Sequence, residues 1–146
     1  MVGLSIKLDL VQSYIEPTLN NPMVANKTKN VLVIDDCRDN LLLMELLLQS
    51  EGYGVNLASS GMQGLAEIKK SAPDLVVLDL MMPDLSGLEV IQRLKESRRL
   101  SSIPTLLLTA NANLERQDAL NADEVCYKPF NIGNILNKIS SLLSRR

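Results

Sequence analysis

Five short apolar runs alternate with stretches of helical spacing, and this alternation constrains the fold more than any other feature of the sequence. The runs cover residues 31–34, 55–58, 75–79, 103–108 and 125–127. Apolar runs of this length, bounded by turn residues, predict buried strands. Strands that alternate with helices predict a parallel sheet with right-handed crossovers. We therefore expect an α/β fold in which helices cover both faces of a five-stranded parallel sheet.

Start and stop signals delimit the expected helices. Asp39 and Asn40 can cap a helix over 41–50, which Glu51-Gly52 ends. Capping-box patterns at 60–63 and 86–89 open two further helices, and 114–120 predicts a brief one. Asn131 can cap a last helix. Its predicted inward-facing residues are Ile132, Ile135, Leu136, Ile139, Leu142 and Leu143.

Residues 1–29 differ from the rest of the chain, so we divide it into an N-terminal extension, 1–29, and a domain, 30–146. Leu4, Leu8, Val11 and Ile15 have helical spacing, and Pro17 then interrupts the pattern. We expect a poorly ordered extension that is dispensable for the fold. The alternative is a short amphipathic helix that docks on the domain or on a partner.

Composition excludes several classes of function. Aromatic residues make up 3% of the 146 residues, and the net charge is −2, which argues against nucleic-acid binding. No membrane span or signal peptide is visible, and two scattered cysteines fit a reducing cytoplasm. The absence of histidine excludes a histidine triad and a phosphohistidine in this chain.

Polar side chains stand where four of the predicted strands end. They are Asp35 and Asp36 after the first, Asp79 at the end of the third, Thr109 after the fourth and Lys128 after the fifth. Each alone is an ordinary turn or loop residue. Because the carboxyl ends of parallel strands meet at one edge of a sheet, we expect these side chains to converge in one crevice.

The chemistry of that crevice follows from its charges. Three clustered carboxylates repel one another, and a hard cation with oxygen ligands such as Mg²⁺ relieves the repulsion. A carboxylate can also act as a nucleophile and form an aspartyl phosphate. Lys128 and the Thr109 hydroxyl could then contact phosphate oxygens.

Four stretches give the chain a close resemblance to the receiver domains of two-component response regulators. They are VLVIDD at 31–36, LDLMMPDLSG at 78–87, LTA at 108–110 and KPF at 128–130. Together they are highly specific, and the resemblance covers the chain from about residue 29 onwards. It implies a flavodoxin-like doubly wound sheet with strand order 2-1-3-4-5.

The resemblance also implies roles for the strand-end residues. Asp79 would accept a phosphoryl group from a sensor histidine kinase or a phosphotransfer protein. Asp36, Asp79 and the backbone carbonyl of Met81 would hold Mg²⁺, with Asp35 helping through water. Thr109 and Lys128 would contact the phosphate and couple it to the opposite face, and the Lys128–Pro129 bond is often cis in the family.

The implied protein is a stand-alone response regulator without an output domain, which signals through a downstream protein partner in the cytoplasm. It would be no enzyme beyond its own phosphorylation and dephosphorylation. We expect no direct contact with nucleic acid or membrane, and a homodimer stays open.

The sequence departs from the family pattern around the fifth strand. The family's aromatic switch position is Val125, and Tyr127 stands next to Lys128 instead. The segment between Thr109 and Lys128 is shorter than usual, and residues 121–123, Asn-Ala-Asp, stand in place of the family's usual glycine before the fifth strand. We hypothesise that an order–disorder change in 111–123 replaces the rotamer switch.

Two other classes of function compete with this interpretation. A haloacid-dehalogenase-like phosphatase also uses a strand-end aspartate with Mg²⁺, but it needs a second aspartate where Met81 stands. A constitutive docking protein with a vestigial acidic site is the second alternative, which Val125 suggests. Turnover of a small phosphate ester would favour the first, and failure to incorporate phosphate the second.

Overall fold

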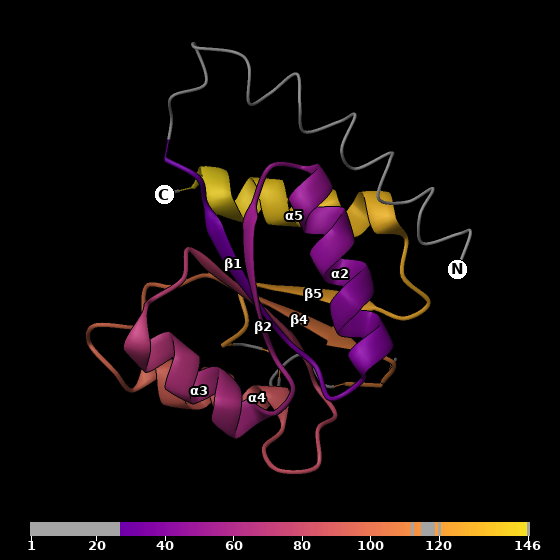
Figure 1. Ribbon diagram of the computed structural model, residues 1–146. Helices are drawn as coiled ribbons and strands as arrows, with labels where there is room; N and C mark the ends of the chain where they lie inside the picture. Colours follow the sequence, from indigo (N-terminus) through magenta and orange to yellow (C-terminus); the bar gives the residue numbers. More distant parts are fainter. Residues whose placement is uncertain (1–26, 112, 115–118, 120, 146) are drawn as a thin grey trace.

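The computed structural model describes residues 27–111, 113–114, 119 and 121–145. Within them, five parallel strands form one sheet with the order β2-β1-β3-β4-β5. The elements are β1 (Asn30–Ile34), α2 (Arg38–Ser50), β2 (Gly54–Ala58), α3 (Gly61–Lys70), β3 (Leu75–Asp79), α4 (Gly87–Lys95), β4 (Thr105–Thr109), β5 (Glu124–Tyr127) and α5 (Ile132–Ser144). Helices α2 and α5 cover one face of the sheet, and α3 and α4 cover the other (Figure 1). The predicted fold and strand order are confirmed.

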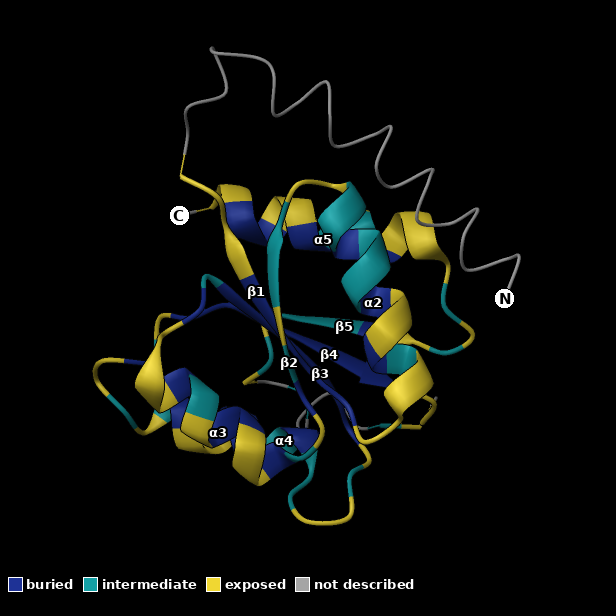
Figure 2. Cartoon of the chain, in the orientation of Figure 1, coloured by how far each residue is buried: buried dark blue, intermediate teal, exposed yellow. Residues whose placement is uncertain are grey.

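Two apolar cores lie on the two faces of the sheet, because successive strand residues point to opposite sides. In β1, Val31 and Val33 pack with α2 and α5, while Leu32 and Ile34 pack with α3 and α4. The central strand β3 is buried along its whole length (Figure 2). Burial on both faces explains why its sequence is a continuous apolar run rather than an alternating one.

The start of α2 differs from the prediction. The helix begins at Arg38, and its N-cap residue Cys37 makes no side-chain capping bond. Asn40 does not cap, because it is already the third residue of the helix, and its side-chain amide donates to Asp35 at 3.2 Å. The C-terminal end follows the prediction, since Gly52 adopts a φ of +88° just beyond it, a conformation that glycine adopts without strain.

The other helix starts follow their sequence signals closely. Ser86 and Glu89 form both bonds of a capping box at α4, and the Asn131 side chain caps α5. At α3, Ser60 caps Gln63, but the Gln63 side chain accepts from the Ser59 backbone N–H at 2.7 Å instead of closing the box.

Two predicted details at the β4–α5 end of the chain are wrong. Ile132 was expected to face inward, but it is 45% exposed, because it is the first residue of α5 and lies before the turn that packs on the sheet. The fourth strand begins at Thr105 rather than at 103, while its end at Thr109 agrees with the prediction. Proline at 104 has no N–H for the ladder, so pairing starts after it. The brief helix predicted over 114–120 falls mostly outside the described residues, and Leu114 and Ala119 are not helical.

Each helix among the described residues is too short or too polar to cross a bilayer.

Candidate functional site

Three carboxylates converge at the carboxyl edge of the sheet. Asp35 and Asp36 follow β1, and Asp79 is the last residue of β3. One oxygen from each of the three lies within 4.8 Å of the others. The strands β1 and β3 are direct neighbours in the sheet, which brings their ends together.

Asp35 is fixed by bonds on both of its oxygens. It is 4% exposed. Its Oδ1 accepts from the Cys37 backbone N–H at 2.8 Å, and its Oδ2 accepts from Asn40 at 3.2 Å. These donors leave Asp35 well oriented but already partly satisfied, whereas Asp36 is exposed at the mouth of the crevice.

Asp79 is buried, with an exposure of 7%, and its carboxylate faces Lys128. The distance from Asp79 Oδ1 to Lys128 Nζ is 3.5 Å. Burial raises the pKa of Asp79 above its ordinary value of 3.8, and the neighbouring charge of Asp35 raises it further, while Lys128 opposes the change. The ionised carboxylate is therefore held where its charge is poorly solvated.

Thr109 and Lys128 stand at the ends of the neighbouring strands β4 and β5. Thr109 is fully buried, and its hydroxyl oxygen accepts from the Asn111 backbone N–H at 2.9 Å. The Lys128 backbone N–H donates to the Thr109 carbonyl at 2.7 Å, which ties the two residues together. The Lys128–Pro129 bond is cis, and the ammonium lies 5.4 Å from the centre of the Phe130 ring.

The loop after Asp79 holds a residue whose role the sequence did not reveal. Asp84 lies beyond the crevice, and its carboxylate accepts from the backbone N–H groups of Gly61 and Met62 at 3.1 and 2.8 Å. These bonds lower the pKa of Asp84. The carboxylate thus caps the start of α3, a helix far away in sequence, where negative charge is favoured.

The carboxylate cluster has the donors that Mg²⁺ prefers. Oxygen ligands from one or two carboxylates, with water and phosphate completing the shell, are the usual protein site for this ion. Among the described residues, Lys128 is the one cation that contacts the Asp79 carboxylate, and Asp36 is open to solvent. The Met81 side chain is 71% exposed, so it stands clear of the crevice.

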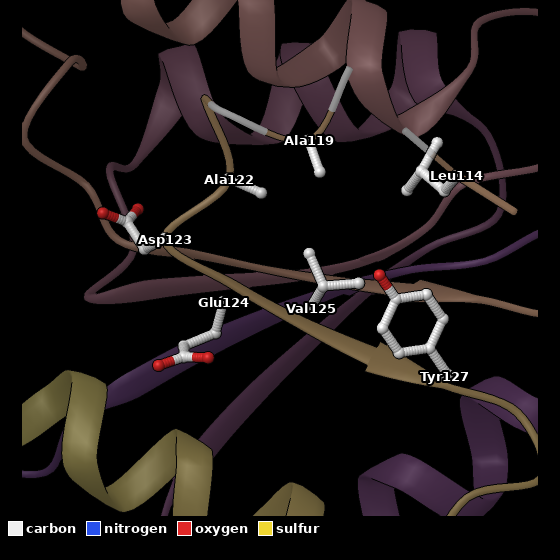
Figure 3. A pocket seen from close by; sticks show the side chains of 7 residues that line it. All are labelled: Leu114, Ala119, Ala122, Asp123, Glu124, Val125 and Tyr127. Atoms are coloured by element: carbon white, nitrogen blue, oxygen red, sulfur yellow. The ribbon is translucent and has the colours of Figure 1, made fainter. Parts of the chain in front are cut away.

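A pocket lies beside β5, around Val125, the position at which the resemblance to receiver domains implies an aromatic switch. The pocket has a volume of about 540 Å³. Figure 3 shows Val125 and Tyr127 turned towards Ala119, Ala122 and Leu114 across it. Val125 is half-buried, and Tyr127 is 49% exposed. The aromatic ring of this strand thus stands at its exposed end, at Tyr127, and not at the predicted switch position, Val125.

A family model described as the response regulator receiver domain matches residues 31–140. The chain belongs to the response regulator receiver family. Relatives in this family include the transcriptional regulatory protein TrcR of Mycobacterium tuberculosis, 36% identical over 118 residues, and the DNA-binding regulator RpaA of Synechocystis, 37% identical over 120 residues. Each match covers 79% of this chain, but only 45% and 49% of those relatives, so the chain spans about half of their length.

Solved structures support the same assignment. A CheY-like receiver domain protein from Methanospirillum hungatei has a TM-score of 0.75 at 30% identity, over 82% of this chain and 96% of that one. The response regulator TrrA of Thermotoga maritima, in complex with Mg²⁺ and BeF, has a TM-score of 0.73 at 33% identity, over 79% and 99%. A receiver domain is a signalling module of two-component systems rather than a turnover enzyme.

Proposed function

We propose that this receiver accepts a phosphoryl group on Asp79 and signals in that state through a protein partner. The observation that carries the proposal is a buried carboxylate at the end of β3, 3.5 Å from the Lys128 ammonium and within 4.8 Å of two further carboxylates. The donor is a sensor histidine kinase or a phosphotransfer protein in the cytoplasm, as is usual for two-component systems. The relatives TrcR and RpaA are transcriptional regulators, and we do not propose DNA binding for this chain.

Each residue has a part in the proposed transfer. A carboxylate oxygen of Asp79 forms a bond to phosphorus while the bond from phosphorus to the donor atom breaks, and the donor leaves with the electron pair. Lys128 neutralises charge on the phosphoryl oxygens. The Thr109 hydroxyl, whose oxygen accepts from the Asn111 backbone N–H, donates its own proton to one of them.

Asp36, Asp79 and the Met81 carbonyl are the proposed Mg²⁺ ligands, and Asp35 acts through water. When bound, the ion supplies positive charge at the phosphoryl oxygens. The two hydrogen bonds already made by Asp35 support its secondary place in this set. The TrrA structure holds Mg²⁺ and BeF together, which is the chemistry proposed for this crevice.

Labelling with acetyl phosphate and Mg²⁺ tests the proposal. The intact chain should gain one phosphoryl group, seen as added mass, and Asp79→Asn should gain none. Asp84→Asn is the matched control, because it changes an aspartate of the same loop that caps α3. Equal labelling of Asp79→Asn and the intact chain would reject Asp79 as acceptor. Loss of labelling in all three proteins would instead support the docking protein with a vestigial site.

A further inference from the structure

Helix α2 has an apolar face that turns away from the sheet. Its buried residues are Leu41, Met44 and Leu48. The remaining leucines are Leu42, Leu43, Leu46 and Leu47, which we call the outer leucine face. At 3.6 residues per turn, these four fall within an arc of about 140° on the side opposite the buried residues. Leu42 and Leu43 are 43% and 42% exposed, and Leu46 and Leu47 are half-buried.

Single exposed leucines are common on protein surfaces, but the outer leucine face has four neighbouring leucines. The other large exposed apolar residues of the described helices stand alone, with Met62 on α3 and Ile132 on α5. Four leucines at spacings of three and four residues form a continuous apolar surface, which the polar residues Glu45 and Gln49 border on one side. The outer leucine face therefore has the character of a contact surface.

The chain itself contains a segment of matching pattern and length. Leu4, Leu8, Val11 and Ile15 are spaced by four, three and four residues, which places them on one side of a helix. Twelve residues in a helix span about 18 Å, and the 13 residues of α2 span about 20 Å. The residues of this segment lie outside the described part of the chain, so the match rests on sequence and on the surface of α2.

The point where the described chain begins lies beside the end of α2. The Lys29 carbonyl accepts from the Gly54 backbone N–H at 2.9 Å, and the neighbouring Tyr53 N–H donates to Leu48 in the last turn of α2 at 3.1 Å. Residues 16–28 can extend over about 40 Å, twice the length of α2, so the segment reaches the whole outer leucine face. A short tether also gives the segment an effective concentration on the order of millimolar at the outer leucine face. A second copy of the chain or a separate partner of equal affinity would have to be present at a higher concentration to compete.

We propose that residues 4–15 dock as an amphipathic helix on the outer leucine face of their own chain. The side chains of Leu4, Leu8, Val11 and Ile15 would cover Leu42, Leu43, Leu46 and Leu47. The proposal assigns a role to the N-terminal segment that does not depend on the phosphorylation of Asp79. It makes α2 a helix that is covered on both sides within one molecule.

Amide hydrogen exchange on the full-length chain tests this docking. We expect residues 5–15 to exchange about tenfold or more slowly than the same sequence as a free peptide. The double variant Leu42→Gln/Leu43→Gln should lose this protection and keep that of β1 and β3. Met62→Gln is the matched control, because it removes an exposed apolar side chain from α3. In this variant residues 5–15 should keep the wild-type level of protection. Leu8→Gln should lose the same protection at 5–15, because it removes an apolar side chain from the docking segment itself.

Three results would overturn the proposal. Free-peptide exchange rates at 5–15 in the intact chain would mean that the segment does not dock. Full protection in both the double variant and Leu8→Gln would mean that it docks elsewhere. Protection that appears only at concentrations where sedimentation reports a dimer would assign the outer leucine face to a second copy of the chain.

Discussion

At the scale of single residues, the Asp79 carboxylate is held where its own charge is disfavoured. It is buried, two further carboxylates lie within 4.8 Å, and the only described cation beside it is Lys128 at 3.5 Å. Such a group gains from anything that spreads or neutralises negative charge. The same burial that destabilises the free carboxylate therefore favours the binding of a positively charged group beside it.

The pH dependence of stability should report the cost of this charge. Because the pKa of Asp79 is raised by burial and by Asp35, the native state binds a proton more readily than the unfolded chain does. The free energy of unfolding therefore falls as the pH rises from 3.8 through the raised pKa. In metal-free buffer we expect Asp79→Asn to melt a few degrees above the wild type at pH 7. The difference should shrink as the pH falls towards 3.8. A wild type that melts at or above the variant at pH 7 would contradict this.

Magnesium should reverse the penalty through Asp36 and Asp79. A ligand that binds only the native state raises its stability by mass action, so Mg²⁺ should raise the melting temperature of the wild type. Asp36→Ala should lose most of this rise, since it removes an exposed ligand without opening the core. Asp39→Ala is the control, because Asp39 is an exposed acid on the first turn of α2 and outside the carboxylate cluster. An unchanged Mg²⁺ response in Asp36→Ala would remove Asp36 from the ligand set.

At the scale of elements, helix ends with local signals were predictable and those shaped by the site were not. The capping box of Ser86 and Glu89 needs only residues three apart, and the structure has both bonds. The start of α2 lies at Arg38, before both predicted caps, and the Asn40 amide there donates to Asp35 of the carboxylate cluster instead of capping the helix. Asp84 caps α3 across 22 and 23 positions of sequence, and no local pattern encodes such a bond.

The connection from β3 to α4 should be intolerant of a side chain at Gly87. The Gly87 N–H donates to the Leu80 carbonyl at 2.8 Å, and a Cβ there would lie 2.5 Å from the Asp79 carbonyl oxygen and 2.8 Å from Leu107 Cδ1. Overpacking of this kind costs about 1–3 kcal/mol, so Gly87→Ala should lower the free energy of unfolding by that amount in urea titrations. It should also slow labelling of Asp79, because the strand end must shift.

Gly133→Ala is the matched control for this substitution. Gly133 lies on the exposed first turn of α5, and an added Cβ there would meet only the end of the Asn131 side chain at 3.2 Å. That atom is the oxygen that caps the Asn134 N–H, so its small shift offsets part of the about 0.5–1 kcal/mol by which alanine favours a helix over glycine. This variant should therefore lose much less stability than Gly87→Ala. Equal destabilisation by both substitutions would show that the close approach at Gly87 carries no special cost.

At the scale of the whole molecule, sheet topology explains why so much of the site could be predicted. Parallel strands bring their carboxyl ends to one edge, so Asp35, Asp36, Asp79 and Lys128 meet once the strands are assigned. What the pattern of strands could not predict is the surface beyond β5. Most of 111–123 is either loop or outside the described residues, so the order–disorder hypothesis stays a prediction. The exposed Tyr127 and the half-buried Val125 are compatible with a signalling face that differs from the family pattern.

The division of the chain into an extension and a domain leads to the last prediction. Both cores are closed by described helices, and β1 begins at Asn30, with Lys29 already bonded to Gly54. Deletion of residues 1–26 should therefore keep a single cooperative unfolding transition and wild-type labelling by acetyl phosphate. The truncated chain should bind more of a hydrophobic dye, because the outer leucine face loses its proposed cover, and Leu42→Gln/Leu43→Gln in that background should reverse the increase. Loss of cooperative unfolding in the truncated chain would show that the N-terminal segment completes the core instead of resting on its surface.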